Sequence, residues 1–386
     1  MAVQKEIWQR TIVEGLFADE SFLSKAVNDD MYVNEGKKVH IPNAGAPSGV
    51  EINRSSLPAQ VNKRTDVDVE YTLDELTTNP ILIPYADTVE LSYNKRNSVI
   101  DQDRKEIIFK AAEAILAKWC PAASNRVNTT GKGVAAWTPS ATGLRKAITP
   151  ADVAALQLRM NQDNVPQTDR FLLLDANMYQ QLLDGMTNTQ AIGFFQAADV
   201  KRGVMGMLYG FEVMVRSTVY RFAADGTIKA YGAAGAATDL AGGLAWQRDS
   251  LSRALGEVIM FDQVNNPEYY GDVYSFLVRT GGAIRRYDKK GVYAIVTDTA
   301  TEVTGLSLDD TSIEVAKDAT QEVTATATPS SESAATQWVV DDETIATIDK
   351  SVGASVTVTG VAAGQTVLKA TNGKQEVLAI ITVTGE

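Results

Sequence analysis

The chain has 386 residues, of which 45% are hydrophobic and 22% are charged, and this composition predicts a globular protein of two or three folding units. One Cys and one His exclude a disulfide-bonded scaffold and a metal scaffold built from these residues. The net charge of −12 argues against a protein that binds nucleic acid over its whole surface.

Residues 1–36 are predicted to form a helical N-terminal arm, because apolar side chains recur there at three- and four-residue spacing. They include Trp8, Leu16, Phe17 and Phe22. The first residues are polar and lack the apolar core of a signal peptide. No apolar run approaches the roughly 20 residues that span a bilayer. We therefore expect a protein made in the cytoplasm that does not enter a membrane.

Residues 37–80 are predicted to form a long two-stranded hairpin. Val39–Pro42 and Asp66–Leu73 alternate between apolar and polar side chains, as half-buried strands do. The stretch between them is rich in Pro, Gly and Asn, which favour turns. Such a hairpin is marginally stable alone, so we expect it to lean on another part of the assembly.

A long helix is predicted at about residues 98–119, with Ser98 as its N-cap and Pro121 as its stop. Ile107, Ala111 and Ile115 mark its apolar face. At 1.5 Å per residue this helix is roughly 30 Å long.

The remainder of residues 81–300 is predicted to mix helices and strands without a regular βαβ order, which is typical of an α+β fold. A helix starts at Thr149 and Pro150, where Thr can cap it and Pro can occupy the first turn. The other predicted elements are strands at Phe171–Leu174, Phe211–Ser217, Phe276–Val278 and Val292–Val296, a helix at Ala176–Leu183 closed by Gly185, and a Gly/Ala-rich connection at Gly232–Gly243.

The last 86 residues, 301–386, differ from the rest in charge and pattern. They carry four Lys or Arg against 13 Asp or Glu, a net charge of −9, which leaves −3 for residues 1–300. Seven or eight short β-rich runs recur there every eight to twelve residues around a single Trp338. Asn372-Gly373 is a hairpin-turn signal. This pattern predicts an all-β sandwich.

The search for catalytic, cofactor-binding and metal-binding residues gives none. His40 is alone, so there is no His-based triad or two-His metal site. Cys120 follows Trp119 at a helix end, where a packed thiol is favoured over a nucleophile. Gly131-Lys132-Gly133 lacks the spacing of a phosphate loop. We therefore expect a structural protein, not an enzyme.

Pairs of like charge along the chain are interpreted as solvated or as contacts between subunits. The acidic pairs do not match a calcium-binding loop. The basic pairs are too short for a DNA-reading surface. These basic pairs are Lys63-Arg64, Arg285-Arg286 and Lys289-Lys290.

The order of an N-terminal arm, an extended hairpin, one long helix and an α+β region resembles the major capsid protein of tailed bacteriophages, with its Hong Kong 97-like fold. The stretch Thr149–Leu183 is similar to the axial domain of such coats, and Gly206–Ser217 resembles their Gly-x-x-x-Gly-x-x-Val strand. The resemblance implies that residues 37–80 are the E-loop, that the helix at about 98–119 is the spine helix, and that 81–300 form the peripheral and axial domains.

Residues 301–386 resemble a bacterial immunoglobulin-like domain of group 2. The likeness is carried by Val303–Leu308, Gln337–Asp349 and Val358–Thr371. This resemblance implies a disulfide-free β-sandwich of the kind found on cell surfaces and as decorations of phage structural proteins.

The capsid resemblance implies a coat subunit that assembles into pentamers and hexamers and encloses double-stranded DNA without reading its sequence. It also implies a separate scaffolding protein, a portal and a maturation protease, with assembly in the host cytoplasm and a final place in the virion capsid. Assembly contacts are expected from the arm and the E-loop. The residues named for this role are Trp8, Phe17, Arg54, Lys63 and Arg64. Covalent cross-linking through Lys63 is not predicted, because no partner can be assigned.

Two alternatives remain open from the sequence. One is a bacterial surface or adhesion protein ending in an Ig-like module, and the other is an encapsulin-type shell protein. For the acidic tail we hypothesise weak, multivalent binding to host glycans or mucus on the virion surface.

Overall fold

The computed structural model describes residues 20–34, 38–43, 52–55, 57–58, 61, 67–85, 95–286, 288–301 and 303–385. They divide into a first unit within residues 1–127, 150–233 and 241–296, and a second unit within residues 128–149, 234–240 and 297–386. The first unit combines helices with sheets, and the second is almost entirely β. The predicted α+β class is therefore confirmed.

The larger sheet of the first unit is mixed, with the order β11-β12-β10-β14-β17-β7 and β13 paired to β14. Its strand β10 is buried along its whole length, as the apolar run Phe171–Leu174 predicts. β10 runs parallel to β12 and antiparallel to β14. The strands are β7 (Arg126–Asn128), β10 (Arg170–Asp175), β11 (Gly206–Leu208), β12 (Phe211–Arg216), β13 (Tyr220–Phe222), β14 (Leu240–Gln247) and β17 (Val292–Val296).

The prediction of a connection at 232–243 is wrong for its last four residues, which begin β14. A Cβ on Gly243 would lie 2.8 Å from the carbonyl oxygen of Leu173. Glycine is therefore required there by the close approach of β14 to β10, and not by a flexible loop.

Three helices accompany this sheet: α4 (Pro150–Gln162), α5 (Ala176–Asp184) and α6 (Asn188–Gln196). Pro150 is the first residue of α4, as predicted. The carboxylate of Asp175 caps α5 by accepting a hydrogen bond from the Met178 N–H at 2.7 Å, and Gly185 ends this helix as expected.

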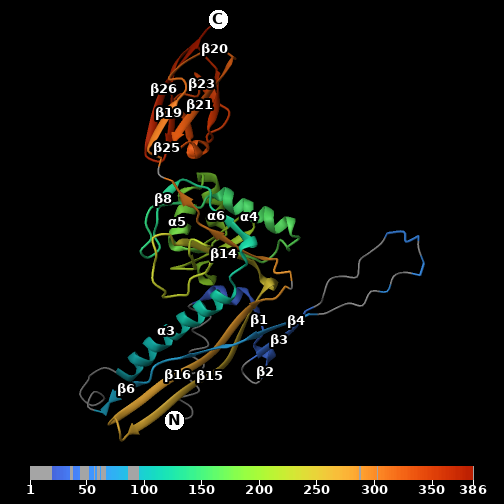
Figure 1. Cartoon of the computed structure of the whole chain (residues 1–386), viewed down its shortest axis with the longest axis vertical. Coiled ribbons are helices and arrows are strands. Elements are labelled where there is room, and N and C mark those ends of the chain that lie inside the picture. The colour runs from blue at the N-terminus through green and yellow to red at the C-terminus, as the bar shows by residue number, and fades with distance from the viewer. Residues whose placement is uncertain are drawn as a thin grey trace. The chain divides into compact units, whose positions relative to one another are not determined.

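The second sheet of the first unit contains a long antiparallel hairpin that the sequence patterns did not predict at this length. It consists of β15 (Leu251–Asn266) and β16 (Gly271–Ile284). β1 (Val27–Asn28) flanks β15, while β5 (Asp74–Thr77) and β6 (Ile81–Pro84) pair with β16. Helix α3 (Lys95–Lys118) lies along this hairpin and packs against β16 (Figure 1).

Helix α3 is the predicted long helix, but it begins three residues earlier than expected. Ser98 therefore lies inside the helix and does not cap it. The apolar face is placed as predicted, and its buried side chains are Ile107, Ile108, Ala111, Ala112, Ile115, Leu116 and Trp119. The Trp119 indole N–H donates a hydrogen bond to the Ser252 carbonyl at 2.8 Å, which joins the end of the helix to β15.

The segment 20–34 is not the continuous helical arm that was predicted. It forms the 3-10 helices η1 (Ser21–Lys25) and η2 (Asp30–Tyr32) and the short strands β1 and β2 (Val33–Asn34). Phe22 is 2% exposed and packs edge-on against Trp119. These apolar side chains are thus part of the core of the first unit. The predicted helix over residues 1–19 lies outside the described residues.

The base of the predicted hairpin is an antiparallel pair of strands, β3 (Lys38–Asn43) and β4 (Val67–Thr72). Val39 and Ile41 are buried in a small cluster with Ala254 of β15. Tyr71 and Leu73 pack on the same cluster. The base of the hairpin therefore leans on the chain's own β15, which gives it a core that two strands alone would lack.

The second unit contains a small sheet, β18-β9-β8, and a β-sandwich. The small sheet consists of β8 (Gly133–Ala135), β9 (Leu144–Lys146) and β18 (Thr299–Ala300). The Arg145 guanidinium, which is buried, donates hydrogen bonds to the carbonyl oxygens of Ala237 and Asp239 at 2.9–3.1 Å. This ties residues 234–240 to the small sheet.

The sandwich has two four-stranded sheets, β19-β21-β24-β23 and β20-β26-β25-β22 (Figure 1). Each predicted β-rich run is a strand, and Trp338 is 1% exposed in the core between the sheets. The strands are β19 (Gly305–Leu308), β20 (Ser312–Ala316), β21 (Thr320–Thr328), β22 (Gln337–Val340), β23 (Ala346–Ile348), β24 (Ser355–Gly360), β25 (Gly364–Asn372) and β26 (Gln375–Thr384).

Asn372-Gly373 marks a hairpin turn, as predicted, although Asn372 is the last residue of β25 and pairs with Gln375. Gly373 has φ +62° and Lys374 is not among the residues with positive φ, which is the pattern of a type II′ turn. The Asn372 amide is buried and donates to the carbonyl oxygen of Glu332 at 2.8 Å.

Candidate assembly surfaces

The strands β3 and β4 lead into a stretch whose described apolar side chains face solvent. Ile52 is 85% exposed, Leu57 83% and Val61 94%. We call these three residues the hairpin patch. Single exposed apolar residues are ordinary, but three within a ten-residue stretch of the sequence are a concentration of exposed apolar side chains that a partner can cover. Arg54 lies among them and is exposed.

Of the residues expected to make assembly contacts, Arg54 is described, and it lies between Ile52 and Leu57 in the sequence. Trp8, Phe17, Lys63 and Arg64 lie outside the described residues. Their role therefore stays a prediction.

A buried polar network anchors the root of the hairpin. Asp29 is fully buried, and its Oδ2 accepts a hydrogen bond from the Tyr71 hydroxyl at 3.2 Å. Its Oδ1 lies 3.5 Å from Arg285, and its backbone N–H donates to the Arg253 carbonyl. Burial raises the pKa of Tyr71, so its hydroxyl remains a donor at neutral pH. The network thus joins β4, β15 and the segment after β1.

A second group of exposed side chains lies at the end of the sheet where β15 turns into β16. The sequence patterns did not predict this group. Tyr270 is 82% exposed and Tyr269 55%, and Tyr85 after β6 is 66% exposed. The Tyr85 N–H donates to the Tyr270 carbonyl at 3.0 Å, so these aromatic residues come together at one end of the sheet. Aromatic side chains are enriched at protein interfaces, which makes this end a candidate contact.

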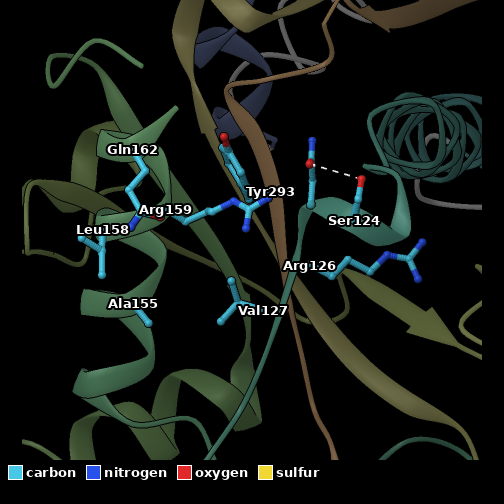
Figure 2. A pocket seen from close by; sticks show the side chains of 9 residues that line it. Ser124, Arg126, Val127, Ala155, Leu158, Arg159, Gln162 and Tyr293 are labelled. Carbon is cyan, nitrogen blue, oxygen red and sulfur yellow. Dashed lines mark hydrogen bonds between the residues drawn. The ribbon is translucent and has the colours of Figure 1, made fainter. Parts of the chain in front are cut away.

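A pocket of about 210 Å³ lies between α4 and the segment leading into β7 (Figure 2). Beside it, Asp163 accepts hydrogen bonds from the Tyr293 hydroxyl at 2.7 Å and from Lys290 at 2.8 Å. These two donors, with Arg159 nearby, hold the pKa of Asp163 below its ordinary value. In Figure 2 the Arg126 side chain extends away from Arg159, so the two guanidinium groups do not converge on one ligand.

Two of the predicted basic pairs are used inside the chain. Arg285 pairs with Asp29, Arg286 with Asp288 and Lys290 with Asp163. These three side chains remain 24–42% exposed, so they are partly solvated and also form intramolecular ion pairs. They stabilise the connection between β16 and β17.

The two residues considered for catalysis from the sequence are His40 and Cys120. His40 lies 3.0 Å from Glu70 across the β3–β4 pair. Burial raises the pKa of the Cys120 thiol, which disfavours the nucleophilic thiolate. Among the described residues no group of three or more His, Cys, Asp or Glu side chains could hold a metal ion. In the same part of the chain, no helix is long and apolar enough to cross a bilayer.

The two outer faces of the sandwich differ in chemistry. The outward side chains of β21 and β24 are Thr, Ser and Glu. On the other sheet, Val339, Leu378 and Ile380 are 53–54% exposed. These three residues form an aliphatic patch around Lys369, which pairs with Glu376 at 2.7 Å.

Comparison with solved structures finds phage capsids. The capsid of Ralstonia phage GP4 is similar over 73% of this chain and 89% of that chain, with a TM-score of 0.53 and 11% sequence identity. The capsid of cyanophage P-SCSP1u covers 70% of this chain and 86% of its own, with a TM-score of 0.49 and 16% identity. Comparison with curated protein sequences finds no match.

The fold is therefore that of phage capsid proteins, as the resemblance in the sequence implied. Within this chain, residues 302–383 match the family model of the bacterial Ig-like domain of group 2. The β-sandwich thus confirms the second resemblance, and the chain combines a capsid-type fold with an Ig-like domain.

Proposed function

We propose that this chain is a coat subunit that assembles into an icosahedral shell around packaged double-stranded DNA. The observation that carries the proposal is the hairpin patch, set on a capsid-type fold. Its aliphatic side chains are 83–94% exposed, while the hairpin root is held by a buried network. Such a surface is stabilised when a neighbouring subunit covers it. The role is structural and not catalytic.

The proposed assembly consists of pentamers and hexamers of this chain. A separate scaffolding protein, a portal and a maturation protease would act on it in the host cytoplasm, and the mature subunit would reside in the virion capsid. The net charge of −3 on residues 1–300 suits a shell that contains a polyanion without adhering to it over its whole inner surface.

Electron microscopy of the full-length chain, produced with and without the scaffolding protein of its source, tests the proposal. We expect closed icosahedral shells when the scaffold is present. Subunits that stay monomeric under both conditions would contradict the shell function and favour a surface or adhesion protein.

For the Ig-like domain we propose display on the outside of the shell and weak binding to host glycans or mucus. Trp338 is the only aromatic residue in 301–386 and it is buried, so no aromatic ring of this domain is free to stack on a sugar. Each copy would therefore bind weakly, and many copies on one particle would supply the avidity. Retention of intact particles on a mucin column, compared with particles lacking residues 303–386, tests this. Equal retention would reject the idea.

A further inference from the structure

A polar pocket of about 300 Å³ in the first unit gathers more positive than negative charge. It lies where η1, the start of β10, the 3-10 helix η4 (Val200–Arg202) and the end of β14 meet. Its charged lining residues are Lys25, Lys201, Arg202, Arg248, Asp169 and Glu212. The pocket thus holds four cations and two carboxylates, although residues 1–300 as a whole carry a slightly negative charge. This local excess of positive charge favours the binding of an anion.

The floor of this pocket is already neutralised, and its rim is not. Lys25 is 9% exposed, and its ammonium group lies 3.1 Å from the Glu212 carboxylate and 5.0 Å from the centre of the Phe171 ring. At the rim, Lys201, Arg202 and Arg248 are exposed. Within the described residues, none of these three side chains has an ion-pair partner. Unpaired charge is therefore available to a ligand.

The lining favours a phosphate group over other anions. Two guanidinium groups can each present two N–H donors to phosphate oxygens. Ser21 and Ser24 add hydroxyl groups to the same wall. Phe171 is 2% exposed, so its ring cannot stack on a nucleobase. Recognition would thus be confined to phosphate, without base preference.

We propose that this pocket, at Lys201, Arg202 and Arg248, binds a phosphate group, either a backbone phosphate of a polynucleotide or a free phosphate ion. The first source rests on the proposed enclosure of DNA, whereas the second does not. Of the two carboxylates in the lining, Glu212 pairs with Lys25, whereas Asp169 has no ion-pair partner among the described residues. The negative charge of Asp169 would therefore repel an anionic ligand. It has φ +55°, a conformation that Asn also adopts readily, so Asp169→Asn removes this repulsion with little strain.

The test uses the full-length chain at constant ionic strength, with two probes. Binding of inorganic phosphate is measured as the shift in melting temperature that phosphate causes relative to chloride. Binding of a fluorescent oligothymidylate is measured by fluorescence anisotropy. We expect Arg202→Gln/Arg248→Gln to weaken phosphate binding about tenfold, since two close charges are lost. Asp169→Asn should strengthen it severalfold. The control Lys105→Gln/Lys132→Gln removes the same charge at exposed positions elsewhere.

If the double variant binds both probes more weakly, a backbone phosphate is supported as the ligand. If it binds only inorganic phosphate more weakly, the free ion is supported. The proposal is overturned if the double variant binds inorganic phosphate as the wild type does, or if the control weakens binding equally. Shell assembly of the same variants, followed by electron microscopy, is a separate readout, so a failure of the pocket is not confused with a failure of the coat function.

Discussion

At the scale of single residues, two carboxylates connect parts of the first unit that are far apart in sequence. Asp163, at the end of α4, holds Tyr293 of β17 and Lys290. Asp29 holds Tyr71 of β4 and lies beside Arg285. The carboxylate of Asp29 is fully buried, whereas the side chain of Asp163 is 16% exposed, so removal of the donor to Asp29 leaves a buried polar group unsatisfied.

Asp163→Asn should lower the free energy of unfolding by about 1–3 kcal/mol at neutral pH, because two charge-stabilised hydrogen bonds are weakened. The folded-state pKa of Asp163 is below its ordinary value, so its contribution is present above the unfolded pKa and is lost as the pH falls through the folded pKa. The difference between wild type and variant should therefore shrink at about pH 3. Thermal unfolding at both pH values measures it, with the exposed Asp184→Asn as control. A constant difference would contradict this assignment.

Tyr71→Phe should destabilise the first unit by about 1–3 kcal/mol, because the fully buried Asp29 side chain would lose its hydroxyl donor. Tyr269→Phe, at an exposed position, should change little. Denaturant unfolding followed by Trp fluorescence compares the two. Equal stability of the two variants would mean that the hydrogen bond to Asp29 contributes nothing.

At the scale of elements, the packing of α3 on the long hairpin depends on a glycine in β16. A Cβ on Gly282 would lie 2.6 Å from the Trp119 indole nitrogen and 3.0 Å from the Ser252 carbonyl oxygen, the two atoms that form the hydrogen bond between helix and strand. Helix and sheet can approach this closely only because position 282 has no side chain.

Gly282→Ala should therefore lower the free energy of unfolding by about 1–3 kcal/mol through overpacking and loss of the Trp119 hydrogen bond. Gly193→Ala is the matched control, because it lies in α6 with no atom within 4 Å of the added Cβ. It should stabilise the chain by about 0.5–1 kcal/mol. Calorimetry would reveal the opposite signs, and two shifts of the same sign would refute the close-packing argument.

The hairpin patch gives a prediction for assembly that does not depend on stability. Leu57→Asp places a charge where a neighbouring subunit is proposed to cover an 83% exposed side chain. It should reduce shell formation at least about tenfold, since an unpaired buried charge costs several kcal/mol, while the melting temperature of the subunit stays unchanged. Ser55→Asp adds the same charge at a neighbouring exposed position. Sedimentation separates shells from subunits, and normal shells from Leu57→Asp would argue against this contact.

Sequence patterns predicted elements best where burial alternates regularly. In β22 and β24 every second side chain is buried, and both strands lie within a residue of their predicted bounds. β15 was missed because register shifts between Leu255 and Val258 and between Gln263 and Asn266 interrupt its alternation. Phe22 has helical spacing in the sequence, yet its tertiary contact with Trp119 places it in a 3-10 helix.

The candidate surfaces were less predictable than the fold. The hairpin was expected from the alternation of its two strands and the Pro and Gly between them, and its base is the β3–β4 pair. Arg54 lies in the sequence between two residues of the hairpin patch. The pocket proposed to bind phosphate was not expected, because its residues come from five separate segments and Lys201-Arg202 alone resembles any solvated basic pair. The pairing of β10 with β12 and β14 brings the segments of Asp169, Glu212 and Arg248 together, which no local sequence pattern indicates.

At the scale of the whole molecule, charge is divided unequally along the chain. A chain ending at residue 302 would have a net charge of −4 instead of −12, since most of the acidic excess lies in the sandwich. Particles of the truncated chain should therefore migrate more slowly toward the anode than full-length particles of equal diameter. Native agarose electrophoresis with light scattering measures both quantities. Unchanged mobility would show that the acidic domain is not on the outer surface.

The strand order of the sandwich also determines how it responds to force. β20, near the start of the domain, runs parallel to β26, its last strand. A pull on the C-terminus against an anchored N-terminal side therefore loads this pair in shear, so that the hydrogen bonds from Ser312 to Ala316 must break together and not one after another. A domain that binds through its C-terminal end would on these grounds act as a stiff, tension-resistant tether.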